Sequence, residues 1–324
     1  MHYLILTAIL FAAMLLYFKI ATKYNIIDKP NSRSSHDYIT IRGGGIVFWL
    51  AAALYSLNLP SFANLEGFSF LIGITLLSAV SFWDDIQSLP NKIRIIIHFF
   101  SISCVFYGLG IFSTLPWYMI ITAYVFFAGI LNAYNFMDGI NGITGLYSLT
   151  ILIALQYINL QQIKFTEPAF INYAILACIV FLFFNFRKKA KCFAGDIGSM
   201  AISFWIVTLL LQLMLKTNSI IWILFLVVYG VDSTLTILHR IYLKQNIFKA
   251  HRMHFYQILA NEKHLLHPFV SSLYAVAQLL ICSIIIPIHF QFPHLEIIAA
   301  ISILLVLSLV YLLKFKFLKK NILA

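Results

Sequence analysis

The chain has 324 residues, of which 62% are hydrophobic and only 10% are charged, with a formal net charge of +11. This balance excludes a water-soluble globular domain and predicts a polytopic membrane protein. The 4 cysteines show no CxxC spacing, so neither a disulfide framework nor a zinc site is expected.

Membrane-spanning helices are predicted wherever about 20 mostly apolar residues follow one another. The candidate segments, in chain order, are 2–18, 43–58, 66–83, 95–112, 117–133, 143–160, 169–186, 198–215, 220–238, 268–288 and 295–313. The prediction is an all-α polytopic bundle of about eleven such helices, folded as a single domain over residues 1–324. Gly230 is expected to bend the ninth helix and open a groove for a lipid chain.

Lysine and arginine mark one side of the membrane. All but Lys164 and Lys216 of the 22 basic residues fall in the regions 19–42, 84–94, 187–191 and 239–264 and in the C-terminal tail. Because positively charged loops face the cytoplasm, the N-terminus is predicted to be periplasmic and the C-terminus cytoplasmic. The net positive charge then suits anionic lipids and anionic substrates, and no nucleic-acid partner is expected.

The first acidic motif is SFWDDIQSLPNK at residues 81–92. Pro90 disfavours helical backbone at the residue before it, so a helix should end here with Asp84 and Asp85 near its C-terminus. Negative charge is unfavourable at that end of a helix, and two adjacent carboxylates repel each other. A cation, a nearby lysine or a proton-transfer role should compensate, unless the pair is simply a solvated turn.

The second motif is NAYNFMDGINGITG at residues 132–145, between two apolar segments. Asn132, Asn135, Asp138 and Asn141 recur at every third residue, and positions three apart are neighbours on a helix. The following glycines should end the helix and leave backbone amides free. The side chains could ligate magnesium, bind a nucleobase or hold a phosphate oxygen; a polar interfacial loop is the alternative.

A third motif, FRKKAKCFAGDIGSM, occupies residues 186–200. Asp196 either caps the next helix, with Ser199 three residues further on, or serves as a ligand. Gly195 and Gly198 let the backbone approach a bound molecule, and a helix N-terminus favours phosphate.

The last basic loop contains His251, Arg252 and His254 within HRIYLKQNIFKAHRMHFYQIL, residues 239–259. Donors of this kind can clamp phosphate. The alternative is an amphipathic basic helix lying on anionic lipid.

Four acidic residues at predicted cytoplasmic helix ends, Asp84, Asp85, Asp138 and Asp196, come from three different hairpins. If the bundle brings these ends together, they form one pocket. Carboxylates among basic loops indicate a divalent metal and a phosphorylated substrate.

In this order the motifs resemble those of the polyprenyl-phosphate N-acetylhexosamine-1-phosphate transferase superfamily (glycosyltransferase family 4). The resemblance covers nearly the whole chain, through DKPNSRSSHDYITIRGGG at 28–45, DDIQSLP at 84–90, NAYNFMDGINGITG at 132–145, GDIGS at 195–199 and HRMHFYQ at 251–257. It implies an enzyme of the bacterial inner membrane that transfers a sugar-1-phosphate from a UDP-amino sugar to undecaprenyl phosphate and releases UMP. The implied cofactor is Mg²⁺, with Mn²⁺ as the substitute, and a homodimer is one implied assembly.

The resemblance also implies roles for individual residues. Asp84 and Asp85 match an essential catalytic pair, and Asp196 and Asn135 match metal-binding positions. A nucleotide and diphosphate site is implied for Asn132, Asp138, Asn141, His251, Arg252 and His254. The first loop, which closes over the donor or the lipid phosphate, contributes Lys29, Arg33, His36 and Arg42. The active site is therefore expected from the cytoplasmic loops 19–42, 84–94, 132–145, 187–199 and 239–267.

Two departures from the family pattern narrow the substrate. HRMHFYQ lacks the histidine run of the peptidoglycan branch, so the sequence looks closer to the O-antigen-initiating branch, whose donors include UDP-GlcNAc and UDP-linked deoxy-amino sugars. Asn141 replaces the second acid of the usual motif. Phospho-MurNAc-pentapeptide transfer is the alternative within the family. Outside it, the rivals are a secondary transporter that uses Asp232, an intramembrane prenyltransferase and a non-catalytic scaffold.

Overall fold

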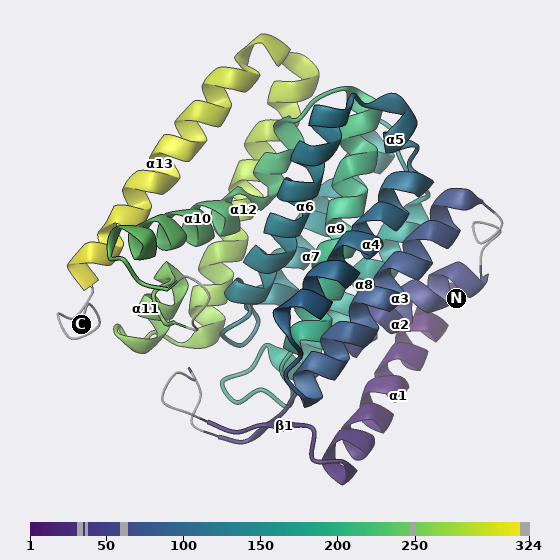
Figure 1. Ribbon diagram of the computed structural model, residues 1–324, viewed down its shortest axis with the longest axis vertical. Coiled ribbons are helices and arrows are strands. Elements are labelled where there is room, and N and C mark those ends of the chain that lie inside the picture. The colour runs from purple at the N-terminus through teal and green to yellow at the C-terminus, as the bar shows by residue number, and fades with distance from the viewer. Residues whose placement is uncertain (31–34, 36–37, 59–63, 247–250, 318–324) are drawn as a thin grey trace.

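The structure is a computed structural model that describes residues 1–30, 35, 38–58, 64–246 and 251–317. It is a bundle of helices with one short hairpin (Figure 1). The first half contains α1 (His2–Lys23), β1 (Ile27–Asp28), β2 (Thr40–Ile41), α2 (Ile46–Asn58), α3 (Leu65–Ile86), α4 (Asn91–Gly108), α5 (Ile111–Thr114) and α6 (Trp117–Met137). The second half contains α7 (Ile143–Gln161), α8 (Pro168–Asn185), α9 (Gly195–Thr217), η2 (Ile221–Leu226), α10 (Val227–Tyr242), α11 (Phe255–Asn261), α12 (His267–Gln291), η3 (Pro293–Leu295) and α13 (Glu296–Phe317).

The predicted all-α membrane architecture is confirmed. Within the described ranges, 9 helical segments are long and apolar enough to cross a bilayer. The spans expected at 43–58 and 95–112 are not among them. The first corresponds to α2, which has only 13 residues, and the second to α4, which begins with the polar Asn91, Lys92 and Arg94.

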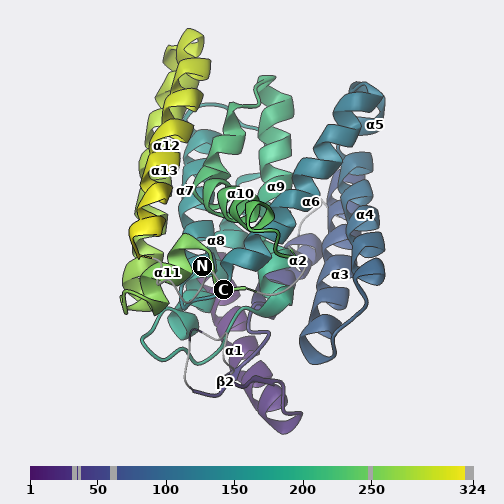
Figure 2. The same ribbon diagram turned by 60° about the vertical axis from the view of Figure 1, so that its left-hand side comes forward.

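The bundle is built around α9. In its most apolar window, 89% of the residues are buried, and α9 packs against α2, α3, α6 and α7. By contrast, only 6% of the corresponding window of α13 is buried, and Figures 1 and 2 show this helix at the edge of the bundle. Because lipid is as apolar as a leucine side chain, close packing rather than hydrophobicity joins membrane helices. Because α9 is the most tightly packed helix, residues at its N-terminus are held firmly in place by the surrounding helices.

The ninth predicted span is not one straight helix. A 3₁₀ segment, η2, passes into α10 at Leu226, where the backbone departs from α-helical values at φ −118° and ψ 7°. From there α10 runs across the bundle, steeply inclined to its neighbours in both views (Figures 1 and 2). The expectation that Gly230 bends this helix is wrong, because the change of direction occurs before it; a Cβ added at Gly230 would meet no atom within 4 Å.

The hairpin of the first loop is held against the start of α9. Strands β1 and β2 pair antiparallel, and Ile41 forms a parallel bridge with Cys192. The pairing continues as Gly44 and Gly45 donate backbone hydrogen bonds to Phe193 and Ala194 at 2.8 and 3.0 Å. Main-chain bonds between segments about 150 residues apart in sequence thus fix Arg42 beside the first turn of α9.

Candidate active site

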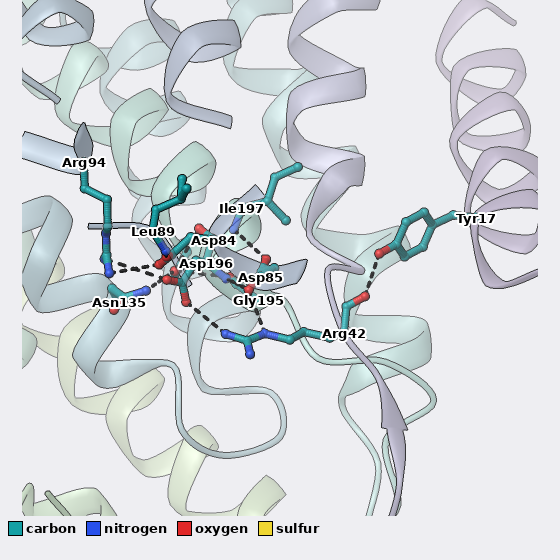
Figure 3. Close-up of polar contacts among 11 residues, drawn as sticks. Tyr17, Arg42, Asp84, Asp85, Leu89, Arg94, Asn135, Gly195, Asp196 and Ile197 are labelled. Atoms are coloured by element: carbon teal, nitrogen blue, oxygen red, sulfur yellow. Dashed lines mark hydrogen bonds and ion pairs between the residues drawn. The ribbon is translucent and has the colours of Figure 1, made fainter. Parts of the chain in front are cut away.

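The carboxylate of Asp85 caps α9 from another helix. It lies in the last turn of α3 with a fully buried side chain, and it accepts hydrogen bonds from the backbone N–H groups of Asp196 (2.9 Å) and Ile197 (3.1 Å) (Figure 3). Negative charge at the C-terminus of α3 is unfavourable, but the same charge is favourable at the N-terminus of α9. A helix that lacks a local side-chain cap is therefore capped by a remote one.

Asp196 is therefore not the N-cap that one interpretation of the sequence expected. The helix starts at Gly195, whose φ of +72° turns the chain into α9, and Asp196 is in the first turn. A Cβ at Gly195 would lie 2.5 Å from Oδ2 of Asp85. Glycine at this position is what allows the Asp85 carboxylate to reach the helix terminus.

Two arginines join the three acids of α3 and α9. Arg42 donates from Nε to Asp85 at 2.7 Å, and its Nη2 lies 3.5 Å from Asp196. Arg94, in the first turn of α4, lies 2.9 Å from Asp84 and 3.7 Å from Asp196 (Figure 3). Among the described residues, the aspartate pair is thus compensated by two arginines and a helix terminus, and not by the lysine that the sequence suggested.

Asp84 has a different environment from Asp85. Its Oδ1 accepts a hydrogen bond from the backbone N–H of Leu89 at 2.6 Å, which closes the turn before Pro90. Its side chain is 10% exposed, whereas that of Asp85 is 0% exposed. Of the two side chains, that of Asp84 is the more exposed.

A polar cavity of about 310 Å³ opens beside this cluster. It brings together the end of α6, the start of α9, the first loop and α11. Its described lining residues are Asp28, Ser35, Arg42, Asn135, Asp138, Gly139, Ile140, Asn141, Asn185, Phe193, Ala194, Gly195, Asp196, Gln257 and His267. Of the four acids expected to share one pocket, Asp138 and Asp196 line this cavity. Asp84 and Asp85 are not among its described lining residues and join the cluster through Arg42 and Arg94.

Asp138 follows the last residue of α6, where the predicted glycine-rich segment does end the helix. Its Oδ1 accepts a hydrogen bond from the Thr144 hydroxyl at 2.6 Å. Burial raises the pKa of Asp138 to about 7, the Thr144 hydroxyl opposes this, and the charges of Asp196 and Asp85 add to it. Burial and the neighbouring carboxyl groups therefore favour the protonated form of Asp138.

The three asparagines of the same motif have separate environments. Asn135 donates to Ser199 Oγ at 3.3 Å and also hydrogen-bonds to Asp196, so it lies within the acidic cluster. Asn132 donates to the carbonyl of Ala128 in its own helix and is not among the described residues that line the cavity. The structure does not bring Asn132 to the site where the sequence predicted it.

Asn141 lines the cavity but also anchors a neighbouring loop. Its Nδ2 donates to the carbonyl oxygens of Arg187 (2.8 Å) and Lys188 (3.2 Å) and to the hydroxyl of Tyr38 (3.1 Å). A carboxylate could not donate to these carbonyls. Asn141 in place of the expected acid thus fits its hydrogen bonds to the 187–188 loop, which require a donor.

Two of the three residues predicted in the last basic loop, Arg252 and His251, have different environments. Arg252 lies in a second polar hollow with Lys188, His264 and His267, next to the first cavity. Burial lowers the pKa of His251 to about 3; its Nδ1 accepts from the Met253 N–H, so only Nε2 remains to donate.

The prediction that His254 binds diphosphate is not supported by its position. Its residue is 1% exposed, and its ring stacks with Phe136 while Nδ1 lies 3.5 Å from Asp232. The imidazole therefore faces the protein interior. His251 and His254 have ring centroids 4.9 Å apart, but both precede α11 instead of sharing a helical face.

The first loop contributes Arg42 at the centre of the cluster. Lys29 is exposed and is not one of the described lining residues, while Arg33 and His36 lie outside the described residues. The Tyr17 hydroxyl donates to the Arg42 carbonyl at 2.6 Å and holds this loop to α1.

Several residues of the site have no role predicted from the sequence. Arg94 is predicted only as a cytoplasmic basic residue, and the others are Asp28, Gln257 and His267. A signal for Arg94 existed, since its position nine residues after Asp85 places it just beyond a tight turn.

The donor set fits a hard divalent cation. Asp196, Asp138 and Asn135 supply oxygen atoms, the ligands that Mg²⁺ prefers. Among the described residues, ion pairs to Arg42 and Arg94 are made by Asp84, Asp85 and Asp196, and Asp138 lies in the same cavity lining as Asp196. In the described part of the chain, no three histidine, cysteine, aspartate or glutamate side chains are grouped closely enough for one ion. The clustering of oxygen donors from α6 and α9, rather than a preformed cage, supports metal binding.

The sequence pattern of glycosyl transferase family 4 matches residues 67–214, which include the acidic cluster. The chain is 27% identical over 256 residues to a probable undecaprenyl-phosphate N-acetylglucosaminyl 1-phosphate transferase of Bacillus subtilis (strain 168), covering 74% of this chain and 71% of that protein. The match and this relative are consistent with the polyprenyl-phosphate N-acetylhexosamine-1-phosphate transferase superfamily that the motifs resemble.

Further relatives cover less of this chain. It is 26% identical over 226 residues to an undecaprenyl-phosphate alpha-N-acetylglucosaminyl 1-phosphate transferase of Escherichia coli (strain K12), covering 64% of this chain and 61% of that protein. A phospho-N-acetylmuramoyl-pentapeptide-transferase of Petrotoga mobilis is 29% identical over 183 residues, covering 49% of this chain and 56% of that protein. The family 4 pattern leaves the first loop and the HRMH segment outside its match.

Proposed function

We propose that this protein transfers an N-acetylhexosamine-1-phosphate from a UDP-sugar to undecaprenyl phosphate, with release of UMP. The observation that carries the proposal is the junction of α3, α6 and α9, where carboxylates and arginines meet beside a polar cavity. Relatives from Bacillus subtilis and Escherichia coli are named for such transfer of N-acetylglucosaminyl 1-phosphate. Two anionic reactants require charge compensation and alignment, and the cluster provides both kinds of group.

The metal proposed for this site is Mg²⁺, with Mn²⁺ as a substitute, held by Asp196 with Asn135 and Asp138. When bound, it would offset phosphate charge and draw the two reactants together. Arg42 and Arg94 orient Asp196, and Asn141 keeps the 187–188 loop beside the cavity. Arg252, with Lys188 and His264 in the adjoining hollow, suits the donor diphosphate.

We assign different tasks to the aspartate pair. Both oxygens of Asp85 already accept hydrogen bonds from α9, so this residue organises the cluster. Asp84 retains some exposure and is the candidate that contacts the lipid phosphate, as a base or by orienting it. This division refines the sequence prediction, which treated the two as equivalent.

The lipid acceptor requires the site to lie at a membrane boundary. The cavity is at the end of the bundle that carries the basic loops, and positively charged loops favour the cytoplasmic side. We therefore propose a multi-pass protein of the bacterial inner membrane whose active site faces the cytoplasm, where UDP-sugars are made available. The crosswise α10 leaves open space at Gly230 that a prenyl chain could fill.

Within the family, we favour an N-acetylglucosamine or deoxy-amino-sugar donor in a cell-envelope pathway such as O-antigen initiation. HRMHFYQ lacks the histidine run of the peptidoglycan branch, although a pentapeptide transferase is among the relatives, which keeps that activity as the second candidate. The alternative of a secondary transporter relied on Asp232 as a proton carrier. This carboxylate instead accepts hydrogen bonds from Phe255 and Tyr274 inside the fold, which argues against that function.

The test of the proposal is a direct assay with membranes containing the protein, undecaprenyl phosphate, Mg²⁺ and a panel of radiolabelled UDP-amino sugars. We expect one labelled lipid to form with equal release of UMP, and tunicamycin to block it. Release of inorganic diphosphate, or solute uptake without UMP, would contradict the proposal. Labelling only from UDP-MurNAc-pentapeptide would select the second candidate.

Arg94→Ala is expected to reduce turnover by about tenfold or more, because losing a charge-assisted hydrogen bond costs about 1.5–3 kcal/mol. The variant leaves Asp84 and Asp196 without a shared partner. Arg94→Lys should be faster than Arg94→Ala but slower than wild type. A lysine ammonium group lacks the planar, multi-donor guanidinium that contacts both carboxylates.

The matched control for Arg94→Ala is Lys92→Ala, which removes an exposed positive charge from the same turn of α4. Steady-state rates of UMP release measure both variants. Equal rates for the two variants would show that Arg94 acts only as one more basic residue.

A further inference from the structure

Asp232 is a buried acid that the proposed chemistry does not use. It lies in α10 and is 3% exposed. Its Oδ1 accepts from the Phe255 N–H at 2.8 Å, and its Oδ2 accepts from the Tyr256 N–H at 3.3 Å and from the Tyr274 hydroxyl at 2.6 Å. A buried carboxylate is tolerated only when such donors surround it.

Two of these donors belong to the first turn of α11. This helix has only 7 residues, and helices so short are not stable by themselves. A local capping box links the His254 N–H to Gln257 Oε1 at 3.3 Å, and Asp232 adds a negative charge from another helix. Asp232 thus does for α11 what Asp85 does for α9.

The position of α11 determines part of the cavity wall. Gln257 lines the cavity, and the Tyr256 hydroxyl donates to the Phe136 carbonyl at 2.9 Å, two residues before Asp138. A Cβ at Gly139 would lie 2.2 Å from that hydroxyl, so the contact is close. Arg252 stands just upstream of the same turn, in the adjoining hollow.

A second layer of contacts surrounds Asp232. Thr236 donates to its Oδ1 at 3.3 Å and lies 2.9 Å from the Tyr311 hydroxyl, to which Lys314 donates at 2.5 Å. Tyr311 and Lys314 are the two buried residues of α13. The otherwise exposed last helix is therefore attached to the fold through the polar groups around Asp232.

We propose that Asp232 is a positioning residue for the donor site. Its carboxylate holds the N-terminus of α11, and through it places Arg252, Gln257 and the Tyr256–Phe136 contact around the cavity. This inference rests on the proposed function for its kinetic consequence, but its structural consequence can be measured without any substrate.

The experiment compares wild type with Asp232→Asn and Tyr274→Phe by hydrogen–deuterium exchange and by kinetics with UDP-GlcNAc. Asparagine keeps one acceptor but presents an N–H₂ group to the remaining donors. We expect faster exchange in residues 251–261, and a KM for UDP-GlcNAc raised by about tenfold with kcat changed by less than about threefold, the pattern of lost ground-state binding. Arg252→Ala should also raise the KM with little change in kcat, but it should leave hydrogen–deuterium exchange in residues 251–261 unchanged.

Tyr173→Phe is the control for Tyr274→Phe, because it also removes the hydroxyl of a buried tyrosine. That hydroxyl bonds to His2 near the start of α8, away from Asp232 and α11. It should leave exchange in 251–261 and the KM unchanged. If Asp232→Asn does not fold, the Tyr274→Phe variant tests the inference, since it removes one hydrogen-bond donor to Asp232 and keeps the aromatic ring. Wild-type exchange and KM in Tyr274→Phe and in any folded Asp232→Asn would overturn the inference. A wild-type protein with no transferase activity would instead reject the proposed function, and the exchange data would still decide the role of Asp232.

Discussion

Asp196→Asn is expected to lower turnover by about 10²–10³-fold, the range typical for removing one charge-stabilising group from an active site. The carboxylate faces both Arg42 and Arg94 and lines the cavity, so it is the group that links the arginines to the proposed metal. Asparagine has nearly the same volume, and the backbone N–H of residue 196 still bonds to Asp85. The fold should therefore persist while the charge is lost.

Initial rates of UMP release over a range of Mg²⁺ concentrations measure this prediction. The variant should need more Mg²⁺ for half-maximal rate, besides being slower. Glu167→Gln is the control, because it removes a negative charge from an exposed side chain paired only with Lys164. Wild-type rate and metal dependence in Asp196→Asn would show that Asp196 is not a metal ligand.

The sequence was sufficient to predict where the helices that carry the acids end, because each end has its own local signal. Helix α3 ends at Ile86, directly after the aspartate pair, and Pro90 directly precedes the next helix. Helix α6 ends at Met137, directly before Asp138 and Gly139, and Gly142 precedes the first residue of α7. Local backbone preferences of this kind do not depend on the rest of the fold. The acids therefore appear at termini where the sequence placed them.

What the sequence could not show were contacts between distant segments. The capping of α9 by Asp85 and of α11 by Asp232 depends on the packing of helices that no local pattern records. The same holds for His254, which looks like a phosphate donor in HRMH but faces inward against Phe136. Residue type alone cannot distinguish a buried histidine from one that binds a ligand.

The break between η2 and α10 was misplaced for a related reason. Leu226 is an ordinary helix former, while Gly230 is the residue that intrinsic propensity marks as a helix breaker. The polar residues of α10, including Asp232, Thr236 and Arg240, are buried against α11 and the 245–246 turn. Satisfying these groups, rather than a glycine, sets the direction of α10.

Gly45→Ala is expected to destabilise the protein by about 3 kcal/mol, at the upper end of the cost of overpacking a well-packed core. A Cβ at this position would lie 2.1 Å from the Cα of Gly198 and 2.8 Å from the carbonyl oxygen of Ala194. Both are backbone atoms, so no side-chain rotation relieves the clash. The first loop would have to move away from α9.

That movement would also reach the active site. Gly45 donates its N–H to Ala194 at 3.0 Å, and Arg42 lies three residues earlier, paired with Asp85. Separating these segments pulls the guanidinium from both Asp85 and Asp196, so turnover should fall even in molecules that remain folded. Thermal inactivation of the detergent-solubilised protein and UMP release before heating measure the two effects.

Gly129→Ala is the control for this pair of measurements. It lies within α6, where a Cβ would meet nothing within 4 Å, and alanine is the better helix former by about 1 kcal/mol. It should match or exceed wild type in thermal stability and retain its activity. Equal behaviour of Gly45→Ala and Gly129→Ala would mean that the first loop does not pack on α9 as described, and that Arg42 is not held at the acidic cluster by this contact.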